Sequence, residues 1–200
     1  MPASLKTFLY LLFACLIGLT ACQEPPPFIF VGDQRPEVEP DIYHPCVNYD
    51  ESENFDATLL EAISSRSDGT RFLEWVKRAE ALDPHFYDYF LGQGTGPVTV
   101  LMPDNAAIER FEMAYPDIFE DTDRFLALLK HHVLLVNVAF KQMQNDGFQP
   151  AMNREPMEFK VTDNYCVIFE EQALLTLADD FSDRDIIHLV DGVIIPNKGF

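Results

Sequence analysis

Two segments of this chain, residues 99–108 (TVLMPDNAAI) and 187–196 (IHLVDGVIIP), constrain its fold more than any other feature. In the first segment, the β-branched and apolar residues from Val98 to Met102 predict a short buried strand, which Pro103 ends because it cannot donate a ladder hydrogen bond. Asp104 and Asn105 are residue types that cap the exposed backbone N–H groups of a helix. We therefore expect a strand that turns sharply into a helix beginning near Ala106.

The second segment predicts another buried strand, from Ile186 to Val190, followed by Asp191-Gly192 and the apolar residues Val193 to Ile195. Asp-Gly is common in tight hairpins, but three residues are too short a partner strand. A bulge or kink within one continuous strand, closed by Pro196, is the preferred interpretation.

Together with His132-Val133, these segments resemble the two signature motifs and the histidine motif of the fasciclin (FAS1) domain, over roughly residues 54–196. Thr99, Val100, Pro103, Asn105 and Ala107 match the first motif, whereas Leu101, Met102, Asp104 and Ile108 depart from it. His131 stands where the family usually has tyrosine, and Arg184-Asp185 where it usually has Asn-Gly. The motif positions, to which we assign structural roles, are Thr99, Val100, Pro103, Asn105, His132, His188, Asp191, Gly192 and Pro196.

The resemblance implies a non-enzymatic extracellular interaction module used in adhesion. In animal members, an Asp-Ile pair just before the second motif has been linked to integrin recognition. Asp179 and Asp180 stand at about those positions, without the isoleucine. Tyr115 to Phe119 contains a similar pair but follows the first motif, so we regard it as coincidence.

The N-terminus predicts a lipoprotein signal peptide over residues 1–21, with a positive charge at Lys6 and an apolar run from Phe8 to Leu19. That run is shorter than the roughly 20 residues of a transmembrane helix. Leu-Thr-Ala-Cys, ending at Cys22, resembles a bacterial lipobox, so Cys22 is the expected lipidation site; several acyl chains would make the attachment stable. The alternative is ordinary signal cleavage beside an incidental cysteine. Since Gln23 is not the aspartate that retains lipoproteins at the inner membrane, we expect an outer-membrane anchor on the periplasmic or cell-surface face.

After the lipidated cysteine, residues 22–50 are expected to form an acidic tether, because six prolines fall within residues 23–50. Phe28 to Val31 is an apolar exception that suggests a short edge strand laid on the domain; the alternative is a contact for a partner. Cys46 and Cys166 can form one disulfide in an oxidising compartment. The bond would close a long loop and stabilise the folded chain by about 4 kcal/mol. The alternative is that Cys166 is a buried thiol in an apolar strand.

Residues 51–200 are expected to form one α+β domain, with N-terminal helices packed on a β-sandwich or wedge of short strands. Apolar residues recur at helical spacing around Leu59–Ile63, Phe72–Ala79 and Phe125–His132. Strand-like runs follow at 157–161, 165–169, 173–177 and 186–195.

The helix opened by Asp83-Pro84 carries four aromatic residues that cannot all face inward. Phe86, Tyr87 and Tyr89 are therefore a candidate binding patch. Core packing with incidental exposure is the alternative.

The formal charge of −19, from 33 acidic and 14 basic side chains, argues against nucleic acid as a partner. We expect no cofactor and no metal site, because no calcium-loop or zinc pattern is present and the adjacent His131 and His132 point to different sides of a helix.

Three functions remain compatible with the sequence. The first is a membrane-anchored lipoprotein whose fasciclin domain binds a protein partner at the outer membrane in adhesion. The second is an accessory subunit of an outer-membrane, TonB-dependent nutrient or glycan uptake complex, which makes a glycan a possible ligand. The third is a hydrolase with an unrecognised site, although no serine or cysteine nucleophile in the sequence has an identifiable base nearby.

Overall fold

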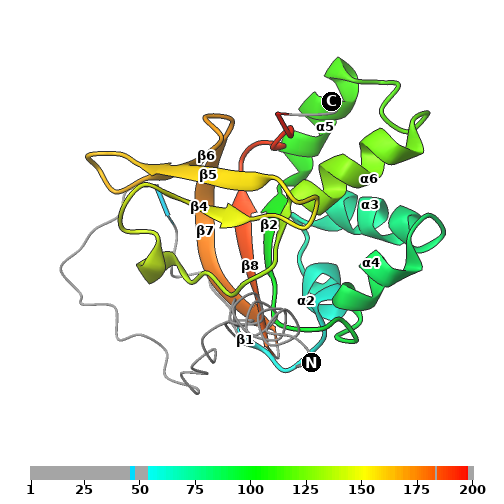
Figure 1. The fold of residues 1–200 in the computed structure, drawn as a ribbon, viewed down its shortest axis with the longest axis horizontal. Helices are drawn as coiled ribbons and strands as arrows, with labels where there is room; N and C mark the ends of the chain where they lie inside the picture. Colours follow the sequence, from blue (N-terminus) through cyan, green and yellow to red (C-terminus); the bar gives the residue numbers. More distant parts are fainter. Residues whose placement is uncertain (1–45, 48–53, 183, 198–200) are drawn as a thin grey trace, which may run out of the picture. The chain divides into compact units, whose positions relative to one another are not determined.

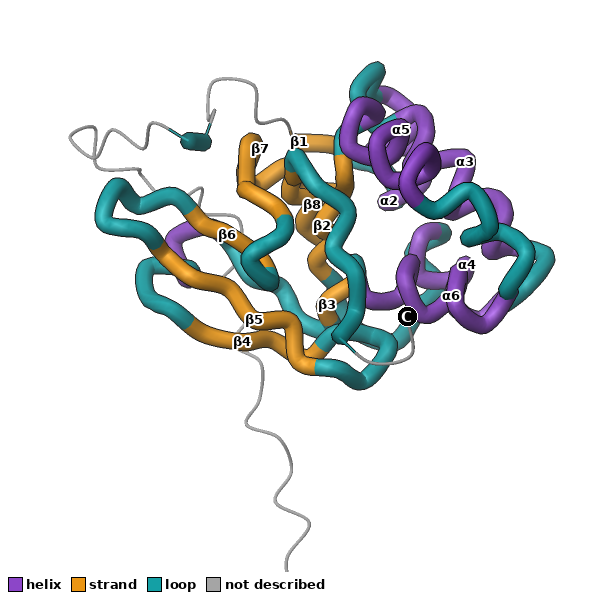
Figure 2. The backbone as a smooth tube through the Cα atoms, turned by 90° about the horizontal axis from the view of Figure 1, so that it is seen from above, coloured by secondary structure: helices purple, strands orange, loops and turns teal. Residues whose placement is uncertain are grey.

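The computed structural model describes residues 46–47, 54–182 and 184–197, all of which lie in the second of two compact units, Glu39–Phe200. The signal peptide, Cys22 and the run Phe28 to Val31 lie outside the described residues. In Figures 1 and 2 the helices gather on one side of the central strands, and β4, β5 and β6 lie on the other. The domain is thus an α+β fold with a helical layer on a curved sheet.

The helical layer consists of α2 (Leu59–Ser65), α3 (Thr70–Glu80), α4 (Pro84–Phe90), α5 (Asn105–Ala114) and α6 (Thr122–His131). Side chains that accept hydrogen bonds from orphan N–H groups start four of these helices. The caps are Thr58, Asp83, Asp104 and Asp121. The predicted caps at Asp83 and Asp104 are confirmed; Asp104 Oδ1 accepts from the Ala107 N–H at 2.6 Å.

The strands pair in the order β3-β2-β8-β7-β6-β5-β4, and β1 (Asn54–Phe55) runs parallel to the end of β7. Their bounds are β2 Thr99–Pro103, β3 Val133–Leu134, β4 Gly147–Pro150, β5 Pro156–Val161, β6 Val167–Phe169, β7 Ala173–Ser182 and β8 Asp185–Val190. A short 3₁₀-helix, Phe140–Gln142, precedes β4. An antiparallel bridge from Leu134 to Ala151 joins the region just after β4 to β3. The last strand of this order, β4, is therefore brought back beside the first, β3, so the sheet is strongly curved.

The central pair β2 and β8 is parallel and buried on both faces, which explains its largely apolar sequence. Because side chains alternate along a strand, Val100 and Met102 pack with the helices, whereas Leu101 packs in a second core between the strands. The two signature segments thus lie between two hydrophobic cores, as a pair of neighbouring strands.

The predicted continuation of one strand was wrong, and a second predicted strand was confirmed but is longer than expected. The strand from Ile186 ends at Val190, and no continuous strand reaches Ile195, because Asp191 and Gly192 turn the chain and Ile194 bonds to a histidine instead of a strand. The strand predicted at 173–177 continues to Ser182, because its two buried aspartates have polar partners within the fold.

Candidate functional site

The residues of the first motif are internal cross-links between segments distant in sequence. The Thr99 hydroxyl, fully buried in β2, donates to the Val136 carbonyl at 2.8 Å and accepts from the Val138 N–H at 2.9 Å. The part-buried Asn105 side chain accepts from the Arg71 N–H at 2.9 Å and donates to the Ser67 carbonyl at 2.8 Å. The Thr99 side chain therefore fixes the segment after β3 to the sheet, and the Asn105 side chain fixes the start of α5 to the start of α3 and the loop before it.

Val100 and Pro103, the other two motif positions in β2, are buried. Val100 pairs with Ile187 of β8, and Pro103 ends the strand opposite Val190. Neither presents a side chain to a ligand.

His188 is a fully buried, neutral histidine in β8. Its Nδ1 accepts from the Asp179 N–H at 3.1 Å, so the ring proton lies on Nε2, which donates to the Val138 carbonyl at 2.7 Å. Burial lowers the pKa of His188, with the charge of Asp179 acting in the opposite direction. The 4.0 Å separation of Nδ1 from Asp179 Oδ1 is accordingly not an ion pair, since the Nδ1 lone pair is already accepting.

His132 is also fully buried but carries its ring proton on the other nitrogen. Nδ1 donates to the Leu128 carbonyl at 3.0 Å, and Nε2 accepts from the Ile194 N–H at 3.0 Å. Burial lowers its pKa to about 3. His132 thus ties the end of α6 to the segment after β8, in a structural position like the one predicted.

The neighbouring His131 is buried as well, and its Nδ1 lies 3.2 Å from Asn153 Oδ1. Burial lowers its pKa too. Among residues 46–47, 54–182 and 184–197, no group of three or more His, Cys, Asp or Glu side chains is arranged to hold a metal ion.

The second motif continues this pattern after β8. Asp191 Oδ1 accepts from the Leu174 N–H at 2.7 Å. At Gly192 a Cβ atom would lie 2.5 Å from the Gln172 carbonyl oxygen, so the close approach requires glycine. Pro196 is buried.

Asp179 and Asp180, at the positions linked to integrin recognition in animal members, are buried within β7. Asp179 Oδ1 accepts from the Phe140 N–H at 2.8 Å, and Asp180 Oδ2 lies 2.6 Å from Arg66 Nη1. Both carboxylates are committed to contacts inside the domain.

The predicted aromatic binding patch is wrong for two of its three residues. Phe86 and Tyr87 are buried, and only Tyr89 is partly exposed, with its ring against Gly94. Phe86, Tyr87 and Phe90 are all buried because α4 packs against both α2 and α3, which covers a wide face of the helix. The sequence of the helix alone gave no sign of this packing.

Cys46 and Cys166 form a disulfide in the structure, with their Cα atoms 5.4 Å apart, inside the usual range for such a bond. Cys166 lies just before β6, at the end of the turn that follows β5. Residue 46 is therefore held against the sheet beside that turn.

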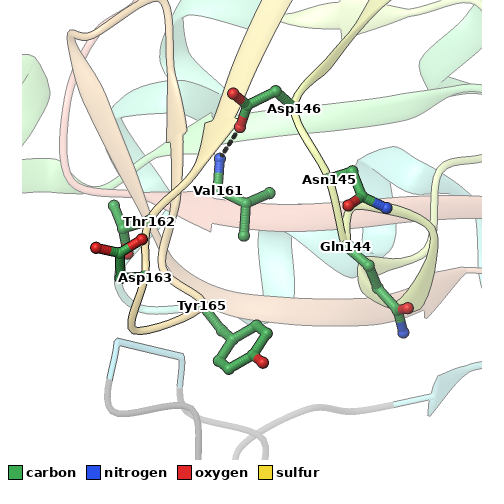
Figure 3. A pocket seen from close by; sticks show the side chains of 7 residues that line it. All are labelled: Gln144, Asn145, Asp146, Val161, Thr162, Asp163 and Tyr165. Atoms are coloured by element: carbon green, nitrogen blue, oxygen red, sulfur yellow. Dashed lines mark hydrogen bonds between the residues drawn. The ribbon is translucent and has the colours of Figure 1, made fainter.

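A surface hollow of about 590 Å³ lies next to the disulfide-bonded turn, between two short segments (Figure 3). One segment is Gln144 to Asp146, before β4. The other is Val161 to Tyr165, of which every residue except Asn164 lines the hollow. Asp146 Oδ1 accepts from the Val161 N–H at 2.7 Å and joins the two segments. The Tyr165 side chain is about half exposed.

The sequence prediction missed this hollow. Residues 165–169 were predicted to be a strand, but Tyr165 adopts a φ of +60° and belongs to the turn. The turn-forming residues Asn145-Asp146-Gly147 and Asp163-Asn164 were the available signal. Nothing in the local pattern showed that the two turns are neighbours in space.

The comparisons with known proteins agree with this geometry. The fasciclin domain family model matches residues 67–196, and the chain belongs to that family. A solved structure of a FAS1 domain pair from the insect cell adhesion molecule Fasciclin I superposes with a TM-score of 0.57 at 17% identity, covering 72% of this chain. This chain spans about half, 52%, of that solved chain. No curated protein matches the chain significantly.

Proposed function

We propose that this chain is a membrane-anchored lipoprotein whose fasciclin domain binds a partner outside the cytoplasm in an adhesion-type role, without catalysis. Family membership is the observation that carries the proposal. The solved structure similar in fold comes from a protein described as a cell adhesion molecule. The buried motif histidines and aspartates support the non-catalytic part of the proposal, because their polar atoms bond within the fold.

The anchor in this proposal is a lipid on Cys22, supported by the Leu-Thr-Ala-Cys sequence and the apolar run before it. No helix within the described part of the chain has the length and apolar content to cross a membrane. The intact mass of the mature N-terminus tests the anchor. A chain beginning at Cys22 with added acyl mass supports it, and an unmodified N-terminus rejects it.

The second candidate is an accessory subunit of an outer-membrane, TonB-dependent nutrient or glycan uptake complex. The polar hollow around Tyr165 is the observation that favours it, because it offers a polar ligand site between the segment before β4 and the turn after β5.

Gentle detergent extraction of the tagged full chain, followed by affinity capture and mass spectrometry, tests both candidates. A stoichiometric transporter favours the second candidate and another surface protein favours the first. The matched control is Cys22→Ser, which keeps the domain and removes the acylated thiol. If captures under mild crosslinking recover no partner above this control, the interaction function is rejected.

A further inference from the structure

The hollow between residues 144–146 and 161–165 has preformed walls. Asp146 fixes one wall to the other through the Val161 N–H. Within the turn, the Tyr165 N–H donates to the Thr162 carbonyl at 2.8 Å, and the Cys166 N–H donates to the Thr162 hydroxyl at 3.1 Å. The disulfide to Cys46 holds the end of this turn. Binding would thus require little ordering of the two walls, which lowers its entropic cost.

Tyr165 is presented at an energetic cost. Its φ of +60° is unfavourable for a residue with a Cβ atom, and the hydrogen bonds of the turn hold the backbone there. This conformation leaves the residue 53% exposed. A rigid, amphipathic ring at the mouth of a hollow is suited to contact a ligand.

The polar groups of the hollow include both donors and acceptors. The lining residues are Gln144, Asn145, Asp146, Val161, Thr162, Asp163 and Tyr165. The two amides and two hydroxyls donate and accept, the carboxylates accept, and no lining side chain is cationic. An anionic ligand would therefore be repelled by the two carboxylates, with no cationic lining side chain to offset that repulsion.

Two ligand classes fit a carboxylate-containing hollow with an aromatic ring. A basic side chain of a partner protein satisfies the carboxylates and the ring, but offers no acceptor to the amide and hydroxyl donors of Gln144, Asn145 and Thr162. A neutral sugar offers hydroxyls that both donate and accept, and its C–H face carries the weak positive charge that the face of the Tyr165 ring attracts. The mixed lining favours the sugar.

We propose that this hollow is a binding site for a neutral carbohydrate, with the Tyr165 ring stacking on a sugar ring and Gln144, Asn145 and Asp163 bonding its hydroxyls. The proposal rests on the proposed interaction function and names the ligand of one surface. Its geometry is the close pairing of the two turns in Figure 3.

Saturation-transfer NMR tests the site, with the full chain in a zwitterionic detergent that lacks a sugar headgroup. The probes are maltohexaose, cellohexaose, xylohexaose and mannohexaose at millimolar concentration. At least one should receive saturation, and Tyr165→Gly should bind it about fivefold more weakly, since stacking contributes about 1 kcal/mol. Glycine tolerates the positive φ, so this variant should fold. Tyr165→Phe should retain binding.

Phe148→Ser is the matched control, because Phe148 is 73% exposed on β4 but does not line the hollow. The proposal is overturned if no probe receives saturation, if Tyr165→Gly binds like the parent, or if Phe148→Ser loses binding equally. It is also overturned if an arginine-rich peptide, and no sugar, shifts the amide signals of the two turns. If Tyr165→Gly loses sugar binding but still captures the membrane partner, both proposals stand; a captured partner without any sugar binding overturns only this site.

Discussion

The contact between Arg66 and Asp180 provides the sharpest test of how the helical layer is joined to the sheet. Arg66 follows α2, and its Nη1 lies 2.6 Å from Asp180 Oδ2 in β7. On the other side of the guanidinium, Nε and Nη2 donate to the two carboxylate oxygens of Asp68, at 2.9 and 2.8 Å. The Arg66 side chain is 10% exposed and that of Asp180 is fully buried. Hydrogen bonding to Asp68 and the charges of both carboxylates raise the pKa of Arg66, with burial opposing them.

Arg66→Met keeps the length and apolar stem of the side chain but removes the charge. The variant leaves the Asp180 carboxylate buried without its arginine, a change that typically costs about 3–5 kcal/mol of unfolding free energy. Asp180→Asn should cost less, because Arg66 keeps its bidentate bond to Asp68. The double variant should lose less than the sum of the two single variants, since no charge is then left buried.

Urea unfolding at neutral pH, followed by circular dichroism on chains lacking residues 1–22, measures these differences. The slope of free energy against urea should stay unchanged, so that shifts in midpoint report stability. A loss below about 1 kcal/mol for Arg66→Met would place the pair among exposed ion pairs and refute the reasoning. Additive losses in the double variant would show that the two side chains do not interact.

Three further predictions concern motif residues. Burial lowers the pKa of His132 from 6.5 to about 3, so below pH 6.5 the unfolded chain takes up a proton that the folded chain does not. At pH 4.5 this difference lowers the unfolding free energy by about 2.7 kcal/mol relative to neutral pH. In urea unfolding, the loss of stability of His132→Gln between neutral pH and pH 4.5 should be smaller by that amount. An equal loss in both chains would contradict this account. Thr99→Val leaves the buried Val138 N–H without its hydroxyl acceptor and should lower the unfolding free energy by about 1–3 kcal/mol, whereas Thr99→Ser should lose less by the same assay. Gly192→Ala forces a Cβ against the Gln172 carbonyl and should lower the thermal midpoint, with a loss of about 1–3 kcal/mol; an unchanged midpoint would show that the turn relaxes freely.

Local chemistry made much of the fold predictable. The caps at Asp83, Asp104 and Asp121 satisfy N–H groups only three residues away, so their signal is contained in a few neighbouring residues. The strand at Thr99 was recognisable because burial on both faces gives an unbroken apolar run.

The errors arose where a distant partner changes what a residue can do. Asp179 and Asp180 appear unsuited to a buried strand, yet bonds from the Phe140 N–H and Arg66 allow β7 to continue through them. Phe86 and Tyr87 were predicted to be available for binding, but two neighbouring helices, α2 and α3, pack against their helix and the two side chains are buried. Tyr165 was predicted to lie in a strand because tyrosine favours strands. Its left-handed φ is set by the turn and not by the preference of the residue.

The family, the α+β class and the expected lipid on Cys22 were predictable from the sequence, because these depend on motifs and periodicities that are continuous along the chain. That the motif polar groups are internal cross-links became visible with the folded chain, because hydrogen bonds and burial act between residues that are close in space but distant in sequence. The hollow likewise depends on the pairing of β4 with β5, which brings residues 144–146 beside residues 161–165.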